Sequence, residues 1–252
     1  MEIKDYLDRI DFNDNLEVNK NTLFKLQKNH LLNIPFENLD IHYNKKISLS
    51  IPEIYQKIVV GKRGGFCYEL NGLFHHLLIK IGFNAKLISA RVHIKDEEYS
   101  PEYDHLCILV NLENQEFLVD VGFGSFSLEP LKLEFNKRVA DCFGTFLFDK
   151  YAAEYYRINE IKNSEMVPQY IFKKVERELI EFKNRCKFHQ TSQESHFFRK
   201  KVISKATEDG RITLTDSQLK RTHLKTKKEI TFKEEEFENK LKQYFNIELK
   251  TT

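Results

Sequence analysis

The chain has 252 residues, of which 41% are hydrophobic, enough for a substantial folded core. Its formal net charge of +2 is close to balance, which gives no case for a nucleic-acid partner. It contains no run of about 18 apolar residues, and its first residues lack an apolar core. We therefore expect no membrane partner and a cytoplasmic location.

The cysteines have no CxxC spacing, which argues against both a zinc site and a disulfide framework. There are four of them, Cys67, Cys107, Cys142 and Cys186. We therefore expect no bound metal, and a reducing compartment in which a reactive thiol stays free.

Residues 1 to about 83 are predicted to be mostly helical. One apolar-leaning helical face precedes Pro35 and contains Leu23, Leu26, His30 and Leu31. A second helix is predicted to start at Ser50, because Pro52 would then occupy an early helical position, where proline is tolerated.

The strongest helical pattern begins at Cys67 and ends near Gly82, a typical C-terminal cap. Its buried face is predicted to contain Leu70, Leu73, Phe74, Leu77, Leu78 and Ile81. Cys67 would lie in the first turn, where free backbone N–H groups and the helix macrodipole favour negative charge. We predict a lowered thiol pKa and a nucleophile at this position. Gly64 and Gly65, just before it, allow close approach of a ligand.

From Ala85 the pattern changes to one typical of antiparallel strands, which are expected to continue to about residue 190. The predicted strands are AKLISARVHI, HLCILVNL, EFLVDVGFG and GTFLFDKY. Residues 167–185 are predicted to be a helical insertion between these strands.

Two of these strands are predicted to form a hairpin with a two-residue turn at Glu113 and Asn114. His105 and Asp120 would then be diagonal neighbours on one face, within side-chain reach. A three-residue turn would put them on opposite faces. A thiol, an imidazole and a carboxylate can act as nucleophile, base and orienting group, so we predict a triad of Cys67, His105 and Asp120.

The last part of the chain is predicted to contain strands over residues 196–206 and 210–216, with a turn between them. A short strand near residues 229–232 follows. The final helix is expected to open at Thr231 with a capping box to Glu234. Its buried stripe would be Phe237, Leu241, Tyr244 and Phe245.

The segments RGGFCYELNGLF, DHL and VDVGFG, in this order and spacing, resemble the arylamine N-acetyltransferase family. Residues 30–40, HLLNIPFENLD, and both chain ends resemble it too, so the resemblance covers nearly the whole chain. It implies a ping-pong transfer of acetyl from the cosubstrate acetyl-coenzyme A, through a cysteine thioester, to an aromatic amine or hydrazine. The implied triad is Cys67, His105 and Asp120.

The expected fold is α/β (α+β) with a papain-like Cys-His-Asp arrangement. We expect an N-terminal helical bundle over residues 1–83 that carries the cysteine. A central antiparallel β-barrel-like domain over residues 84–190 would carry the histidine and the aspartate. A C-terminal α/β lid is expected over residues 191–252.

The resemblance also suggests residues around the triad. Phe36, Val92 and Phe123 match family positions that line the acceptor pocket, and Phe197 is expected to line the same cleft. Apolar walls of this kind suit a flat aromatic amine. An ion-pair group beneath the site, expected to fix the glycine loop, would contain Arg9, Glu37 and Arg63.

Three other functions remain open at this point. A papain-like or transglutaminase-like thiol enzyme uses the same triad without an acyl-coenzyme A. An amide synthase of the same family would close a polyketide chain onto an aromatic amine. A non-catalytic binding homologue would have the same fold but no catalytic activity. The RGGFC and VDVGFG contexts favour the acetyltransferase, and the intact triad argues against a binding protein.

Overall fold

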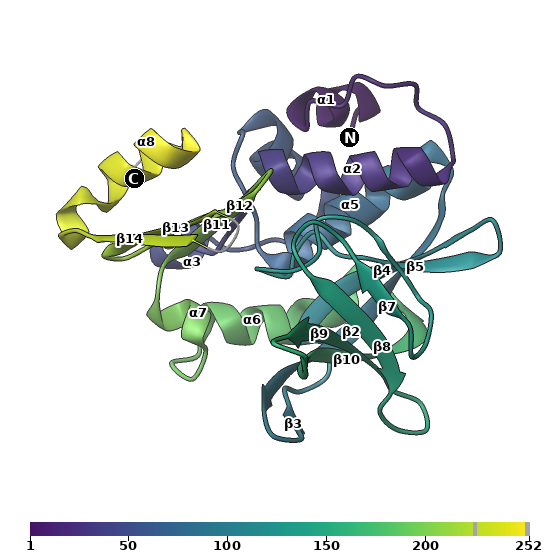
Figure 1. Ribbon diagram of the computed structural model, residues 1–252. Helices are drawn as coiled ribbons and strands as arrows, with labels where there is room; N and C mark the ends of the chain where they lie inside the picture. The colour runs from purple at the N-terminus through teal and green to yellow at the C-terminus, as the bar shows by residue number, and fades with distance from the viewer. Residues whose placement is uncertain (224–225, 250–252) are drawn as a thin grey trace.

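The computed structural model describes residues 1–223 and 226–249. Helices near the N-terminus pack on one side of a large antiparallel sheet, and a smaller sheet with the C-terminal helix lies beside them (Figure 1). None of the described helices is long and apolar enough to cross a bilayer.

The N-terminal part is mostly helical, as predicted. Its helices are α1 (Ile3–Arg9), α2 (Lys20–Asn33), α3 (Leu39–His42), α4 (Ile51–Tyr55), which continues as a π-helical turn (Gln56–Val60), and α5 (Cys67–Ile81). α2 ends before Pro35, and Pro52 lies in the first turn of α4. Gly82 caps α5 with a φ of 110°, a left-handed conformation that favours glycine.

The large sheet is antiparallel throughout and curls into a nearly closed barrel. Its strands are β2 (Asn84–Lys95), β3 (Glu98–Tyr99), β4 (His105–Leu112), β5 (Gln115–Val119), β6 (Leu131–Lys132), β7 (Arg138–Ala140), β8 (Thr145–Lys150), β9 (Tyr156–Lys162) and β10 (Glu165–Arg177). Their order is β6-β5-β4-β2-β10-β9-β8-β7, and β3 pairs with β2. The β-barrel-like prediction is confirmed.

Both faces of β4 are buried, because its alternate side chains pack into two different cores. On β4, Ile108 packs in the core that contains the N-terminal helices, whereas Leu109 packs in the core inside the barrel. The helices therefore cover one face of the sheet while the barrel encloses the other.

The hairpin between β4 and β5 has the predicted two-residue turn. Glu113 and Asn114 have φ values of 53° and 59°, as a type I′ turn requires. Ile108 pairs with Val119, a register that puts residue 107 opposite residue 120. His105 and Asp120 therefore lie on the same face of the hairpin, as predicted.

The predicted helix over residues 167–185 is mostly wrong. β10 occupies its first half, paired with both β2 and β9, and is followed by a 3-10 turn (Leu179–Phe182) and by α6 (Lys183–Thr191). Tyr170, Ile171 and Phe172 are consecutive buried residues in a strand that is covered on both faces. Such an unbroken apolar run has no period-two signal, so it cannot be distinguished from a helix by pattern alone.

A second sheet forms the C-terminal part. Its elements are α7 (His196–Arg199), β11 (Val202–Thr207), β12 (Gly210–Thr215), β13 (Gln218–His223), β14 (Thr226–Thr231), a 3-10 turn (Glu234–Glu236) and α8 (Phe237–Phe245). The predicted strand over residues 196–206 is thus partly wrong, because its start is helical. The predicted helix start at Thr231 is also wrong, since Thr231 pairs with Gln218 in the sheet.

One short strand of the N-terminal part joins this second sheet. β1 (Phe36–Glu37) pairs with β11, and its Phe36 also forms a bridge with Gly65 in the glycine loop. The backbone N–H of Glu37 donates to the carbonyl of Gly65 at 2.8 Å. The division into three domains at residues 83 and 190 remains a prediction. β1 lies in the predicted first domain but pairs with β11 of the predicted third domain.

Candidate active site

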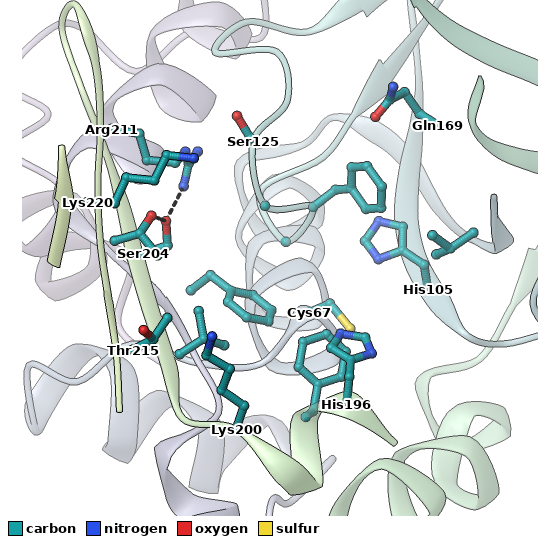
Figure 2. A pocket seen from close by; sticks show the side chains of 18 of the residues that line it. Cys67, His105, Ser125, Gln169, His196, Lys200, Ser204, Arg211, Thr215 and Lys220 are labelled. Carbon is teal, nitrogen blue, oxygen red and sulfur yellow. Dashed lines mark hydrogen bonds between the residues drawn. The ribbon is translucent and has the colours of Figure 1, made fainter. Parts of the chain in front are cut away.

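A cavity of about 720 Å³ lies between the start of α5, the end of the β4–β5 hairpin and the C-terminal sheet. The predicted site residues that line it are Phe36, Cys67, Val92, His105, Phe123 and Phe197. Figure 2 shows Cys67 and His105 on one side of this cavity, with Ser204, Arg211 and Lys220 on the opposite side.

Cys67 is the first residue of α5, and a glutamate two residues later fixes the turn that precedes it. The Oε2 of Glu69 accepts a hydrogen bond from the backbone N–H of Phe66 at 2.8 Å. The same carboxylate accepts from Lys57 Nζ at 2.8 and 2.9 Å. These contacts fix the start of the helix, and therefore the backbone that carries the thiol.

Asp120 orients the ring of His105 through a hydrogen bond to Nε2. The distance from His105 Nε2 to Asp120 Oδ2 is 2.7 Å, and each residue is only 2% exposed. An ionised carboxylate accepts hydrogen bonds and donates none, so this contact places the proton on Nε2. A neutral ring that is protonated on Nε2 has its lone pair on Nδ1. This nitrogen can then accept a proton from a thiol.

The carboxylate of Asp120 accepts hydrogen bonds on both oxygens. Oδ1 accepts from Asn71 Nδ2 at 2.9 Å and from the backbone N–H groups of Gly122 and Phe123 at 2.9 and 3.1 Å. Oδ2 also accepts from the hydroxyl of Tyr170 at 3.1 Å. All these partners can donate, so both oxygens of the buried carboxylate have hydrogen-bond partners.

Gly122 brings the end of the hairpin into direct contact with the start of α5. A Cβ atom at this position would lie 2.7 Å from Asn71 Nδ2 and 2.9 Å from the Cα of Cys67. Only glycine fits such a close approach, so this position sets the distance between the hairpin and the cysteine. The neighbouring Gly124 faces open space, and a Cβ atom there would have no neighbour within 4 Å.

The predicted ion-pair group lies beside the glycine loop and is larger than expected. Arg63 contacts Glu37 at 2.6 Å and Asp40 at 2.9 Å, and Lys57 contacts Asp40 at 2.7 Å. Burial disfavours the ammonium charge, but the surrounding carboxylates outweigh it and raise the pKa of Lys57. Arg9 donates to the backbone carbonyls of Ile58, Asn33 and Arg63 instead of a carboxylate.

The predicted lowering of the Cys67 pKa by the helix start is wrong for the thiol taken alone. Burial raises the pKa of Cys67 well above its ordinary value, and nearby Cys186, Asp104 and Asp120 act in the same direction. A hydrogen bond from the backbone of Tyr68 opposes this but does not outweigh it. The thiolate therefore requires a proton acceptor in the same cavity, and His105, which lines that cavity, is the candidate for this role.

Two supporting residues were missed by sequence reasoning. Asn71 lies one helical turn after Cys67, on the buried face of α5. A polar residue four positions after the nucleophile, on a face that is otherwise apolar, could have indicated this supporting role. Tyr170, whose ring centroid is 5.4 Å from that of His105, lies in the stretch that the sequence pattern predicts to be helical. Within residues 1–223 and 226–249, no group of three or more histidine, cysteine or acidic side chains is arranged to hold a metal ion.

Comparisons with known proteins agree with this fold. The family model described as N-acetyltransferase matches residues 20–252. The arylamine N-acetyltransferase pineal gland isozyme NAT-3 of Gallus gallus is 32% identical, over 99% of this chain and 95% of the relative.

Solved structures share the fold. The arylamine N-acetyltransferase of Mycobacterium abscessus has a TM-score of 0.90 at 27% identity and covers 99% of this chain and 91% of its own. The Mycobacterium marinum enzyme in complex with CoA has a TM-score of 0.88 at 24% identity, with 98% and 93% covered, and so supports the fold alone.

The fold and the site define a thiol enzyme with a papain-like Cys-His-Asp arrangement. Within that class, the chain belongs to the arylamine N-acetyltransferase family and is an acyltransferase. The family resemblance seen in the sequence is therefore confirmed.

Proposed function

We propose that the protein transfers the acetyl group of acetyl-coenzyme A to arylamines and arylhydrazines, through a thioester on Cys67. The observation that carries this proposal is the His105–Asp120 contact at the edge of a cavity that also contains the Cys67 side chain. A base, an orienting carboxylate and a nucleophile are the minimum for covalent acyl transfer.

In the first half-reaction, His105 Nδ1 takes the thiol proton and the sulfur of Cys67 attacks the acetyl carbonyl. The carbon–sulfur bond to coenzyme A then breaks, and the imidazolium returns its proton to the departing thiolate. Asp120 stabilises the imidazolium formed in between. The Cys67 backbone N–H has no partner within α5, because it belongs to the first helical residue, and it is available for the carbonyl oxygen.

In the second half-reaction, the amine nitrogen attacks the thioester carbon. His105 accepts a proton from that nitrogen, and the carbon–sulfur bond to Cys67 breaks to release the amide. The thiolate then regains the proton from the imidazolium. Donor and acceptor thus use the same thiol in turn, which gives ping-pong kinetics.

The acceptor ring is expected to bind between the phenylalanines of the cavity. The ring centroid of Phe123 is 5.0 Å from that of His105, so an aryl group against Phe123 would hold its amine near the base. Further apolar surface comes from Val92 and from Phe36 and Phe197, whose ring centroids are 5.8 Å apart. Flat apolar walls with few polar groups suit an aromatic amine.

Mass spectrometry of the intact protein tests the proposed function directly. Acetyl-coenzyme A should add one acetyl group, and peptide mapping should locate it on Cys67. Aromatic amines should then remove it and appear as amides. An enzyme that stays unmodified with every acyl-coenzyme A would instead favour the amide synthase or the peptidase-like alternative.

We expect Phe123→Ala to weaken acceptors far more than it slows the acetylation of Cys67. The reason is that Phe123 contributes a wall to the acceptor pocket but takes no part in the proton transfers. Stopped-flow measurement of each half-reaction, in wild type and variant, separates the two effects. Equal losses in both half-reactions would mean that Phe123 supports the fold of the site and not the acceptor.

We expect Gly122→Ala to reduce acetyl transfer by about 100-fold, because a Cβ there must displace Cys67 or Asn71, and small displacements of reacting groups have effects of this size. Gly124→Ala is the matched control, since its Cβ would meet open space. Steady-state rates of both variants, with thermal melts to verify folding, make the comparison. Similar activity of the two variants would contradict the role assigned to Gly122.

A further inference from the structure

The turn that leads into His105 contains a strained residue. Tyr103 has a φ of 67°, and it is the only aromatic residue among the described non-glycine residues with a positive φ. Most of the others are asparagine or aspartate, whose short polar side chains tolerate this conformation. A bulky residue with such a φ is strained, and strain of this kind persists only where the surroundings impose it.

Buried hydroxyl groups bind the backbone of this strained residue on both sides. Its N–H donates to Oγ of Ser89, on β2, at 2.8 Å. Its carbonyl accepts from the hydroxyl of Tyr68 at 2.9 Å, and the carbonyl of Asp104 accepts from the same hydroxyl at 3.1 Å. Ser89 is 2% exposed and Tyr68 is completely buried, so these contacts are shielded from solvent.

Tyr68 connects this turn to the nucleophile, because it follows Cys67 in the first turn of α5. Its ring packs against Phe66 and Phe182, with centroid distances of 5.5 and 5.6 Å. Burial raises the pKa of Tyr68 well above its ordinary value, so the hydroxyl keeps its proton and remains a donor. One side chain therefore joins the residue after the nucleophile to the two carbonyls before the base.

The side chain of Asp104 gives the same turn a second anchor. Its Oδ1 accepts hydrogen bonds from Arg185 Nε and from His189 Nε2, the latter at 3.0 Å, and both partners lie on α6. Burial alone would raise the pKa of Asp104, but His189 and Arg185 outweigh it and lower the pKa to about 2. The carboxylate is therefore ionised at neutral pH and is bound to α6.

His105 lies at the end of its strand pairing. β2 pairs with β4 as far as Ala90 and His105, whereas the pairing of β4 with β5 ends earlier, at Ile108 and Val119. The sheet therefore holds the backbone of the base from one side only, and the contacts of the preceding turn decide where this backbone lies. Strained residues cluster at active sites, where the surrounding contacts hold a reacting group in one place.

We propose that Tyr68 is a positioning residue for acetyl transfer: its hydroxyl holds the strained turn at Tyr103 and Asp104, and so fixes the place of His105 relative to Cys67. This inference rests on the proposed function. Without the hydroxyl, both carbonyls lose a donor and the turn can relax, which moves the backbone before the base. The expected loss is therefore in the rate of the chemical step and not in substrate binding.

Tyr68→Phe tests the proposal, because it removes the hydroxyl and keeps the ring packing. Single-turnover acetylation of Cys67 at saturating acetyl-coenzyme A should become about 10- to 100-fold slower, the effect of a small displacement of a reacting group. The half-saturating donor concentration should change by less than about threefold, because no contact with the donor is removed. The rate constant is measured separately from the amplitude, so a misfolded fraction does not mimic the effect.

Tyr6→Phe is the matched control, since it removes another fully buried hydroxyl from the same hydrophobic core. The hydroxyl of Tyr6 contacts His30 Nδ1 at 2.7 Å. Loss of this contact should lower the melting temperature and leave the rate constant near that of wild type. A rate loss as large as that of Tyr68→Phe would make Tyr68 a structural residue only.

A second substitution tests whether strain is the cause. Asparagine tolerates a positive φ better than tyrosine does, so Tyr103→Asn should speed up the Tyr68→Phe enzyme by about threefold or more. The turn would then need less support from the missing hydroxyl. A double variant that is no faster than Tyr68→Phe would contradict the role assigned to the strained turn.

Alkylation of Cys67 by iodoacetamide separates this inference from the proposed function, because it needs neither an acyl donor nor an amine. The reactive thiolate requires His105 as its proton acceptor, so Tyr68→Phe should slow alkylation at neutral pH about tenfold, and Tyr6→Phe should not. Peptide mapping follows Cys67 alone. An enzyme that is never acetylated would contradict the proposed function, and alkylation would still test the positioning role. Equal alkylation rates in wild type and both variants would contradict that role.

Discussion

Cys67→Ala is expected to abolish acetyl transfer, with a loss of at least about 10⁴-fold, because no other group in the cavity can form the thioester. Cys107 and Cys186 are buried in the cores, and burial raises the pKa of both thiols. Intact-mass measurement after incubation with acetyl-coenzyme A, together with steady-state rates, makes the test.

Cys142 provides the control for this prediction, since it is the one exposed cysteine of the four. Cys142→Ser should keep both the rate and the added acetyl mass. If Cys67→Ala still carried an acetyl group, or if Cys142→Ser lost it, the nucleophile assigned to this enzyme would be wrong.

Asp120→Asn is expected to lower the rate of thioester formation by about 10⁴-fold while the fold is retained. The backbone N–H groups of Gly122 and Phe123 would hold the amide oxygen where Oδ1 now lies. The amide nitrogen would then donate to His105 Nε2, and the ring proton would move to Nδ1. A ring protonated at Nδ1 cannot accept the proton of Cys67.

Tyr170→Phe is the matched control, because it removes the other side-chain partner of Asp120 Oδ2 without changing the proton on His105. We expect a loss of less than about tenfold, since only one hydrogen bond disappears. Single-turnover acetylation rates and thermal melts of both variants make the comparison. An Asp120→Asn enzyme with a rate near that of wild type would show that the orientation of His105 is not limiting.

The helix start at Cys67 and the His105–Asp120 pair were predictable from sequence because each depends on local geometry. The helix start at Cys67 follows from an apolar repeat and a glycine cap, and the hairpin register follows from a turn of two residues. The pairing of His105 with Asp120 then follows from the alternation of a strand. No knowledge of distant contacts was needed for these steps.

The surroundings of the triad depend on contacts that are distant in sequence, and these were not predictable. Tyr170 reaches Asp120 only because β10 is a strand between β2 and β9, whereas its unbroken apolar run is equally compatible with a helix. Arg211 could not be singled out among 40 basic residues until the sheet placed it on the cavity wall. The raised pKa of Cys67 also depends on burial, which the helix pattern did not reveal.

The short strand β1 has a mechanical consequence for the enzyme. Its two residues are bonded on one side to β11 of the C-terminal sheet and on the other to the glycine loop before Cys67. The C-terminal sheet and the glycine loop before Cys67 are therefore parts of one hydrogen-bonded unit. We expect a displacement of the C-terminal sheet to move the glycine loop through these hydrogen bonds, and so to shift the backbone that carries the sulfur.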